Sequence, residues 1–278
     1  MPRIYTWQHT VRSYEGDAWG QLQPSGLLRL FERAAIFSSA SNGFDREFYE
    51  EQGTAWVVRR MTILLLSVAH STDDLEISTW GSHFVRVRGG REYRALNITT
   101  DQQVAQGIAE WVYIDRATGT PKAIPADIGA KFEAPGAPLG TYEPPAVAPL
   151  DEPRKFTDSR RAEWYEIDSM GHVNNAIYAD WLDAAWRATM SDMGWSVSRL
   201  KQQGFQMRAE YLMLNYRRET LPGDQLQITT RLVGVEGRLC AITQSITRVG
   251  ESAEIVSSES VYGWADDMGS PCEPPLDL

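Results

Sequence analysis

Residues 14–20 read YEGDAWG, and residues 165–171 read YEIDSMG. The offset of 151 residues that places Asp17 opposite Asp168 continues along the chain without a gap. It also matches three later pairs: Asp73 with Asp224, Leu75 with Leu226, and Ile77 with Ile228. One register held over about sixty residues in each half indicates a duplicated unit rather than chance similarity.

A proline-rich segment separates the two copies. Residues 132–153 hold six of the chain's 14 prolines, and proline fixes φ and removes a backbone donor. We therefore expect an extended, semi-rigid connector there. The predicted domains are an N-terminal repeat at residues 1–131, this connector at 132–153, and a C-terminal repeat at 154–278.

Each copy shows one long helical pattern followed by strand patterns. The first helix should begin near Pro24 and end at Gly43, and the second should be capped by Asn174 or Asn175 and end at Gly194. Strands are expected at 56–68, 75–87 and 108–114 in the first copy and at 207–216, 226–235, 239–249 and 253–264 in the second. Gly89–Gly90 and Glu236–Gly237 are typical of hairpin turns. The pattern predicts an α+β fold in which a curved antiparallel sheet wraps around a long helix, twice in one chain.

Composition excludes several functional classes. The chain has 278 residues and a net charge of −10, which argues against a general nucleic-acid binder. Its two cysteines, Cys240 and Cys272, form neither a metal-binding spacing nor a disulfide framework. The longest purely apolar run, residues 63–66, is too short to span a bilayer, and the first residues carry no apolar signal core. We therefore expect a cytoplasmic protein.

The segment from Asp168 to Asn175 carries the strongest chemical signal. It combines a carboxylate, the His172 imidazole and two amides just before a predicted helix, whose N-terminus presents unpaired N–H groups. Asp168 and His172 could activate water or attack a carbonyl carbon, while backbone N–H groups around Val173 and Asn174 hold the oxyanion. In the alternative interpretation these residues only form a turn and cap the helix. The first copy keeps Asp17 but has Gln21 in place of His172, which favours one active and one silent site.

The stretch His172-Val173-Asn174-Asn175-Ala176-Ile177-Tyr178, preceded by Asp168, resembles the hot-dog-fold thioesterases. The two-copy layout resembles the acyl-acyl-carrier-protein (acyl-ACP) thioesterases of plants and bacteria in particular. Residues 214–219, LNYRRE, resemble that family's tyrosine-arginine-arginine-glutamate strand. The resemblance implies a tandem hot-dog fold, hydrolysis of fatty acyl-ACP to a free fatty acid, and three catalytic residues: Asp168, His172 and Glu219. It also implies a carrier protein with a phosphopantetheine-linked acyl chain as partner.

Two positions depart from the family pattern. Met170 stands where the acyl-ACP enzymes usually have asparagine, and methionine there is familiar in hot-dog enzymes that act on acyl-CoA. Thr220 stands where the plant enzymes often have cysteine. An acyl-CoA thioesterase and a non-catalytic acyl-thioester sensor therefore remain as alternatives, and Asp168 could serve as nucleophile or as general base.

Other sequence features set expectations about ligands. No nucleophile elbow, H-E-x-x-H, P-loop or dinucleotide fingerprint is present, so we expect neither a cofactor nor a metal. Arginines at 86, 88, 91 and 94 surround the Gly89–Gly90 pair and could form a patch that receives an acidic carrier protein, or could simply face solvent. The chain could act as a monomer or a homodimer.

Overall fold

A computed structural model describes residues 4–134, 137 and 139–274 of the protein. Pro135, Gly136 and Pro138, within the predicted connector, lie outside the described residues. The chain divides into two compact units. Unit 1 comprises Met1–Gly16 and Gly26–Tyr142, and unit 2 comprises Asp17–Ser25 and Glu143–Leu278.

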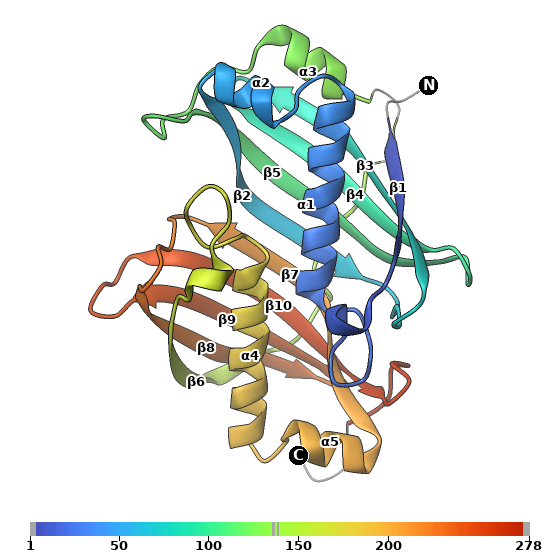
Figure 1. Ribbon diagram of the computed structural model, residues 1–278. Helices are drawn as coiled ribbons and strands as arrows, with labels where there is room; N and C mark the ends of the chain where they lie inside the picture. Colours follow the sequence, from blue (N-terminus) through green and yellow to red (C-terminus); the bar gives the residue numbers. More distant parts are fainter. Residues whose placement is uncertain (1–3, 135–136, 138, 275–278) are drawn as a thin grey trace. The chain divides into compact units, whose positions relative to one another are not determined.

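Unit 1 is an antiparallel sheet with one long helix against it (Figure 1). Its strands are β1 (Tyr5–Thr10), β2 (Thr54–Leu65), β3 (Asp74–Val85), β4 (Arg88–Asn97) and β5 (Gln102–Asp115). Its helical segments are η1 (Ser13–Glu15), α1 (Pro24–Ser41, whose first two residues belong to unit 2), α2 (Arg46–Glu51) and α3 (Ala126–Phe132). Proline at the first position of α1 is favourable because that N–H has no partner in a helix.

Unit 2 repeats this arrangement. Its strands are β6 (Pro149–Arg161), β7 (Phe205–Tyr216), β8 (Gln225–Glu236), β9 (Leu239–Arg248) and β10 (Glu254–Asp266). Its helical segments are η2 (Trp164–Glu166), α4 (Ile177–Asp192) and α5 (Val197–Gln203). The strand order in unit 1 is β1-β3-β4-β5-β2, and that in unit 2 is β6-β8-β9-β10-β7. These are the same topology, so the duplication predicted from the sequence is confirmed at the level of strand pairing.

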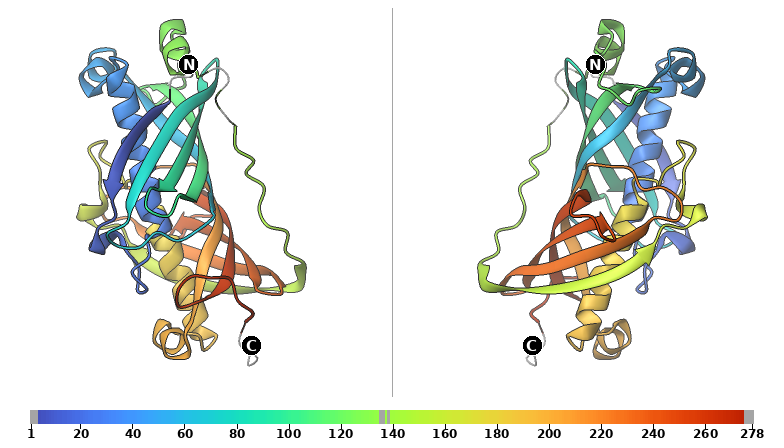
Figure 2. Two further views of the ribbon diagram at one scale, coloured as in Figure 1. Left: turned by 90° about the vertical axis from the view of Figure 1, so that its right-hand side faces the viewer. Right: turned by 90° about the vertical axis from the view of Figure 1, so that its left-hand side faces the viewer.

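Each long helix lies against one face of its own curved sheet (Figure 2), and its apolar side is buried there. On α1, Leu27 and Phe31 are buried, and the Phe31 ring stacks on Tyr93 of β4. On α4, Trp181 and Trp186 are buried, and Trp186 contacts Tyr262 of β10. Burying such aromatic rings removes a large apolar area from water, so these contacts stabilise each unit.

The C-terminal ends of the two long helices agree with the sequence prediction. The predicted N-cap of α4 at Asn174 or Asn175 is wrong, because Ala176 is the N-cap and makes no side-chain cap hydrogen bond, and one predicted hairpin turn is wrong as well. Gly43 and Gly194 have φ values of +82° and +91°, the left-handed conformation expected after a helix. The predicted turn at Gly89–Gly90 is wrong, because both glycines lie inside β4 and the chain turns between β3 and β4. A Cβ at Gly90 would meet the His83 ring at 2.1 Å, so this glycine allows a cross-strand side chain to lie over it.

The two ends of the connector belong to different units. Its first part packs on unit 1, where the Tyr142 hydroxyl and the Gly140 N–H both donate to the buried carboxylate of Glu92. Its last part is strand: β6 begins at Pro149, within the segment predicted as connector. β6 is the edge strand of unit 2, where proline is tolerated because one side needs no ladder donor.

We expect Glu92 to make the stability of the protein depend on pH. Burial raises the pKa of Glu92 above its ordinary value of 4.5, although Tyr142, Gly140 and His83 oppose the shift. The carboxyl of Glu92 therefore binds a proton more readily in the folded state than in the unfolded state. The stability of the protein falls as the pH rises from the ordinary pKa of Glu92 through its higher folded-state pKa. Thermal melting at about pH 5 and about pH 7.5 should show Glu92→Gln more stable than wild type at the higher pH only. The exposed control Glu51→Gln should match wild type at both, and a Glu92→Gln curve parallel to wild type would contradict the prediction.

None of the helices in the described ranges is long and apolar enough to cross a membrane.

Candidate active site

The predicted catalytic segment forms a small hairpin in unit 2. Asn174 N donates to the Glu166 carbonyl at 3.0 Å, Ile167 and Val173 form an antiparallel bridge, and Asp168 N donates to the His172 carbonyl at 2.9 Å. Gly171 at the tip has a φ of +87°, which favours glycine. The spacing D-x-x-x-H therefore places Asp168 and His172 directly opposite each other, as a cross-strand pair.

The two side chains meet above this hairpin. His172 Nδ1 lies 4.0 Å from Asp168 Oδ1, and each side chain is 24% exposed. Asp168 Oδ1 also accepts a hydrogen bond from Met170 N at 2.8 Å, which fixes the carboxylate. The two side chains are adjacent without a direct hydrogen bond to each other, and His172 Nδ1 also lies 3.5 Å from the Val173 carbonyl oxygen.

The predicted oxyanion donors are already occupied. Val173 N donates to the Thr220 carbonyl and Asn174 N to the Glu166 carbonyl, both at 3.0 Å. The expectation that these two N–H groups hold an oxyanion is therefore wrong for this conformation. Asn174 instead caps the turn into α4, because its Oδ1 accepts from Ala176 N at 3.0 Å. Asn175 contributes its carbonyl, which accepts from the Tyr216 hydroxyl at 3.1 Å.

Glu219 lies beside the base of the hairpin. Its neighbour Thr220 accepts the hydrogen bond from Val173 N, and the Glu219 carbonyl accepts from Arg248 at 2.8 Å. Arg248 also pairs with Asp224 at 2.9 Å, which anchors the segment. Among the described residues the exposed Glu219 carboxylate bonds to neither Asp168 nor His172, so the structure joins this third residue to the site through the backbone only.

Two residues of this region were not singled out by the sequence analysis. Glu166 is buried, and its carboxylate accepts hydrogen bonds from β6, from α4 and from the Glu163 backbone. Tyr178, in the first turn of α4, is also buried; burial raises its pKa to about 12, and Asp168 acts in the same direction. The sequence signal for Glu166 was its recurrence as Glu15 in the first copy.

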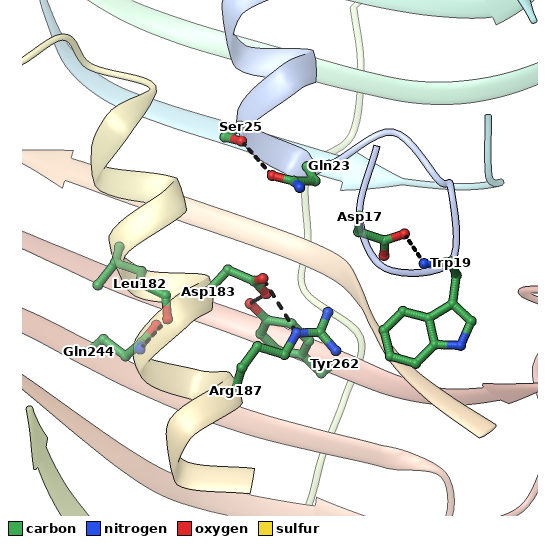
Figure 3. Close-up of polar contacts among 9 residues, drawn as sticks. All are labelled: Asp17, Trp19, Gln23, Ser25, Leu182, Asp183, Arg187, Gln244 and Tyr262. Carbon is green, nitrogen blue, oxygen red and sulfur yellow. Dashed lines mark hydrogen bonds and ion pairs between the residues drawn. The ribbon is translucent and has the colours of Figure 1, made fainter. Parts of the chain in front are cut away.

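The equivalent turn of the first copy has the same backbone but different surroundings. Asp17 Oδ1 accepts from Trp19 N at 2.8 Å, and Gly20 has a φ of +75°, as at Asp168 and Gly171. Figure 3 shows this turn beside α4, where the Arg187 guanidinium lies 5.7 Å from the Trp19 ring centroid. Asp183 pairs with Arg187 at 3.4 Å and accepts from the Tyr262 hydroxyl at 3.2 Å. Here Gln21 replaces the imidazole, so the turn carries no acid–base pair.

The four arginines do not form one patch. Arg86 and Arg88 are exposed at the β3–β4 hairpin, and Arg94 is half-buried over the Trp80 ring. Arg91 is only 7% exposed, faces α1, and donates to Ser38 Oγ at 3.1 Å. Arg91 is therefore excluded from any docking surface, because alternate residues of a strand point to opposite faces.

Among the residues that the structure describes, no three His, Cys, Asp or Glu side chains gather as a metal site requires.

Family models match both halves of the chain. Residues 2–132 match the acyl-ACP thioesterase N-terminal domain, and residues 162–275 match the thioesterase-like superfamily. The first part of the chain is therefore similar to the acyl-ACP thioesterases, and the second part to the wider thioesterase-like superfamily.

The curated relatives of this chain are distant in sequence. A chloroplastic acyl-[acyl-carrier-protein] hydrolase of Cuphea viscosissima is 23% identical over 193 residues, which are 64% of this chain and 46% of the relative. A chloroplastic acyl-acyl carrier protein thioesterase of Arabidopsis thaliana is 20% identical over 142 residues, 50% of this chain and 75% of the relative. The chain therefore spans about half the length of the first of these relatives.

Solved structures show the same tandem hot-dog fold. An oleoyl thioesterase of Lactobacillus plantarum has a TM-score of 0.78 at 20% identity, covering 94% of this chain and 96% of its own. An acyl-ACP thioesterase of Bacteroides thetaiotaomicron has a TM-score of 0.74 at 19% identity, covering 94% and 98%. A 12:0-ACP thioesterase of Umbellularia californica has a TM-score of 0.72 at 17% identity, covering 95% of each chain. At these identities the likeness establishes the fold, and the predicted tandem hot-dog architecture is confirmed.

Proposed function

We propose that this protein hydrolyses fatty acyl-ACP to a free fatty acid and the carrier thiol. The observation that carries the proposal is the Asp168–His172 pair, held 4.0 Å apart on the hairpin before α4. A binding module has no need of an adjacent carboxylate and imidazole, whereas thioester hydrolysis needs a group that accepts a proton from water. The names of the curated relatives, which describe acyl-ACP hydrolysis, support the same chemistry.

In the proposed reaction a water molecule attacks the thioester carbonyl carbon while the Asp168–His172 pair accepts its proton. The C–S bond then breaks, the carboxylic acid is released, and the proton returns to the thiolate. A thiol has an ordinary pKa of about 8.5, so its departure needs little help from a general acid. Glu219 would orient the water or the imidazole from the neighbouring segment. The oxyanion must be held by donors other than Val173 N and Asn174 N, because both are occupied.

An acidic carrier protein is the proposed partner. Arg86 and Arg88 project from the β3–β4 hairpin, and Arg94 lies half-buried farther along β4, in a chain of net charge −10. Local positive charge accelerates the encounter with an acidic partner even when the whole protein is negative. Met170, exposed at the tip of the catalytic hairpin, favours acyl-CoA as the alternative substrate.

Thiol release from a substrate panel tests the proposal. The protein is incubated with acyl-ACP and acyl-CoA of matched chain lengths, and a thiol-reactive dye follows the reaction. We expect turnover with both carriers and a higher kcat/KM for acyl-ACP. Preference for acyl-CoA would move the substrate assignment to the alternative, and binding of acyl thioester without thiol release would show a sensor instead.

A further inference from the structure

Glu166 joins the catalytic hairpin to two other elements of unit 2. Its Oε1 accepts from Arg160 Nη2 on β6 at 2.6 Å and from Trp181 Nε1 on α4 at 2.8 Å. Its Oε2 accepts from Glu163 N at 2.8 Å. Glu166 is only 7% exposed, so these bonds form in a region of low dielectric where charge-assisted hydrogen bonds are strong.

The backbone of the same residue is the base of the hairpin. Its carbonyl accepts from Asn174 N, and the chain then runs through the Ile167–Val173 bridge to the Asp168–His172 pair. Asp168 is two residues from Glu166 and His172 is two residues from Asn174. Any tilt at the base therefore moves the carboxylate and the imidazole together, relative to α4.

The first copy shows which part of this arrangement is special to the catalytic hairpin. Glu15 stands at the equivalent position and accepts from Arg12 N at 2.7 Å and from His9 Nε2 at 2.8 Å. The residue that matches Trp181 is Leu30, which has no side-chain donor. Both copies thus keep the local cap, but in the second copy the carboxylate also accepts a hydrogen bond from its helix.

We propose that Glu166 is a positioning residue, whose carboxylate fixes the hairpin to α4 and β6 so that the Asp168–His172 pair keeps its place relative to α4. This inference rests on the proposed function and adds a residue to it. Glu166 does not touch substrate; it acts through the pair that does. Displacement of a reacting group by about 1 Å can cost a factor of up to about 10² in rate, so a residue at the base of the hairpin can matter without touching the reaction.

A double-mutant cycle separates positioning from general stability. Glu166→Gln keeps the size of the side chain but leaves Arg160 without a carboxylate, and we expect kcat to fall about tenfold with KM nearly unchanged. In a His172→Gln background the same substitution should change kcat by less than about twofold, because the acid–base pair that Glu166 positions is already broken. Glu15→Gln is the matched control from the first copy and should keep the wild-type rate.

A second variant keeps the test decisive if Glu166→Gln does not fold. Trp181→Phe retains a packed ring and removes only the Nε1 donor, and its kcat should fall about threefold with an unchanged circular dichroism spectrum. An active wild type whose Glu166→Gln and Trp181→Phe variants keep full kcat would overturn the inference and leave the proposed function standing. A loss of kcat from Glu166→Gln that persists in the His172→Gln background would also overturn the inference and leave the proposed function standing. A wild-type protein that releases no thiol from any substrate would overturn the proposed function and this inference with it.

Discussion

The Asp168→Asn variant is expected to lose about 10³-fold in kcat/KM for thioester hydrolysis. Asparagine keeps the Oδ1 acceptor that binds Met170 N, so the turn and the hairpin should persist. It removes the negative charge beside His172 and any ability to accept a proton or to attack a carbonyl. The measurement is thiol release under single- and multiple-turnover conditions, with thermal melting to check the fold.

The duplicated turn supplies a matched control for this substitution. Asp17→Asn makes the same chemical change in a turn with the same hydrogen bond, from Trp19 N at 2.8 Å. Asp17 helps to keep the nearby Arg187 charged, so we expect a small loss of stability but a rate within about twofold of wild type. Equal losses in the two variants would mean that the turns have structural roles only, and full activity of Asp168→Asn would dismiss its catalytic role.

Single turnover can also separate the two roles left open for Asp168. A nucleophilic carboxylate would form an anhydride with the acyl group and release thiol in a burst before the acid appears. A general base would release thiol and acid at the same rate in every phase. The position of Asp168 Oδ1, fixed by Met170 N and adjacent to His172, suits the general base, because the imidazole can share the proton taken from water.

The architecture could be predicted because it rests on repeated local patterns. The 151-residue register, the apolar stripe of each helix and the glycines after each helix are all local in the sequence, and each has one structural meaning. The same holds for the Asp168–His172 pair, because a four-residue spacing around a tight turn brings the two side chains together whatever surrounds them. The hairpin turn predicted at Gly89–Gly90 is wrong because a glycine in a sequence has two explanations. It can be required by a turn or by a neighbouring side chain that leaves no room for a Cβ, and the sequence does not distinguish them.

Features that depend on partners distant in the chain could not be read from the sequence. Val173 N donates to the carbonyl of Thr220, which is 47 residues away in the sequence. This hydrogen bond decides whether the Val173 N–H can hold an oxyanion. Arg91 and Arg94 are both arginines near one hairpin, yet the pleat of β4 places one under α1 and the other on the opposite face. In the sequence, Glu166 is distinguished only by its recurrence in the first copy. Its role depends on Arg160 and Trp181, which folding brings into contact with its carboxylate.

The first copy of the repeat suggests a substitution that removes the His172 imidazole without disturbing the turn. His172→Gln installs the residue that occupies the equivalent position there, Gln21, in a turn of the same backbone geometry. Glutamine can form hydrogen bonds but cannot take a proton from water near neutral pH, so a general acid–base contribution should vanish. We expect kcat/KM to fall about 10²-fold or more while the melting temperature stays close to that of wild type.

The size of this loss relative to the Asp168 variant tests whether the two residues act as one unit. If they share the proton, the double variant Asp168→Asn with His172→Gln should be no slower than the slower single variant, because the second change removes nothing further. If they act in separate steps, the losses should multiply. His70→Gln, which changes a half-buried histidine of unit 1, controls for the substitution and should retain the wild-type rate. Retention of full activity by His172→Gln would remove the imidazole from the mechanism and leave Asp168 as the sole base or nucleophile.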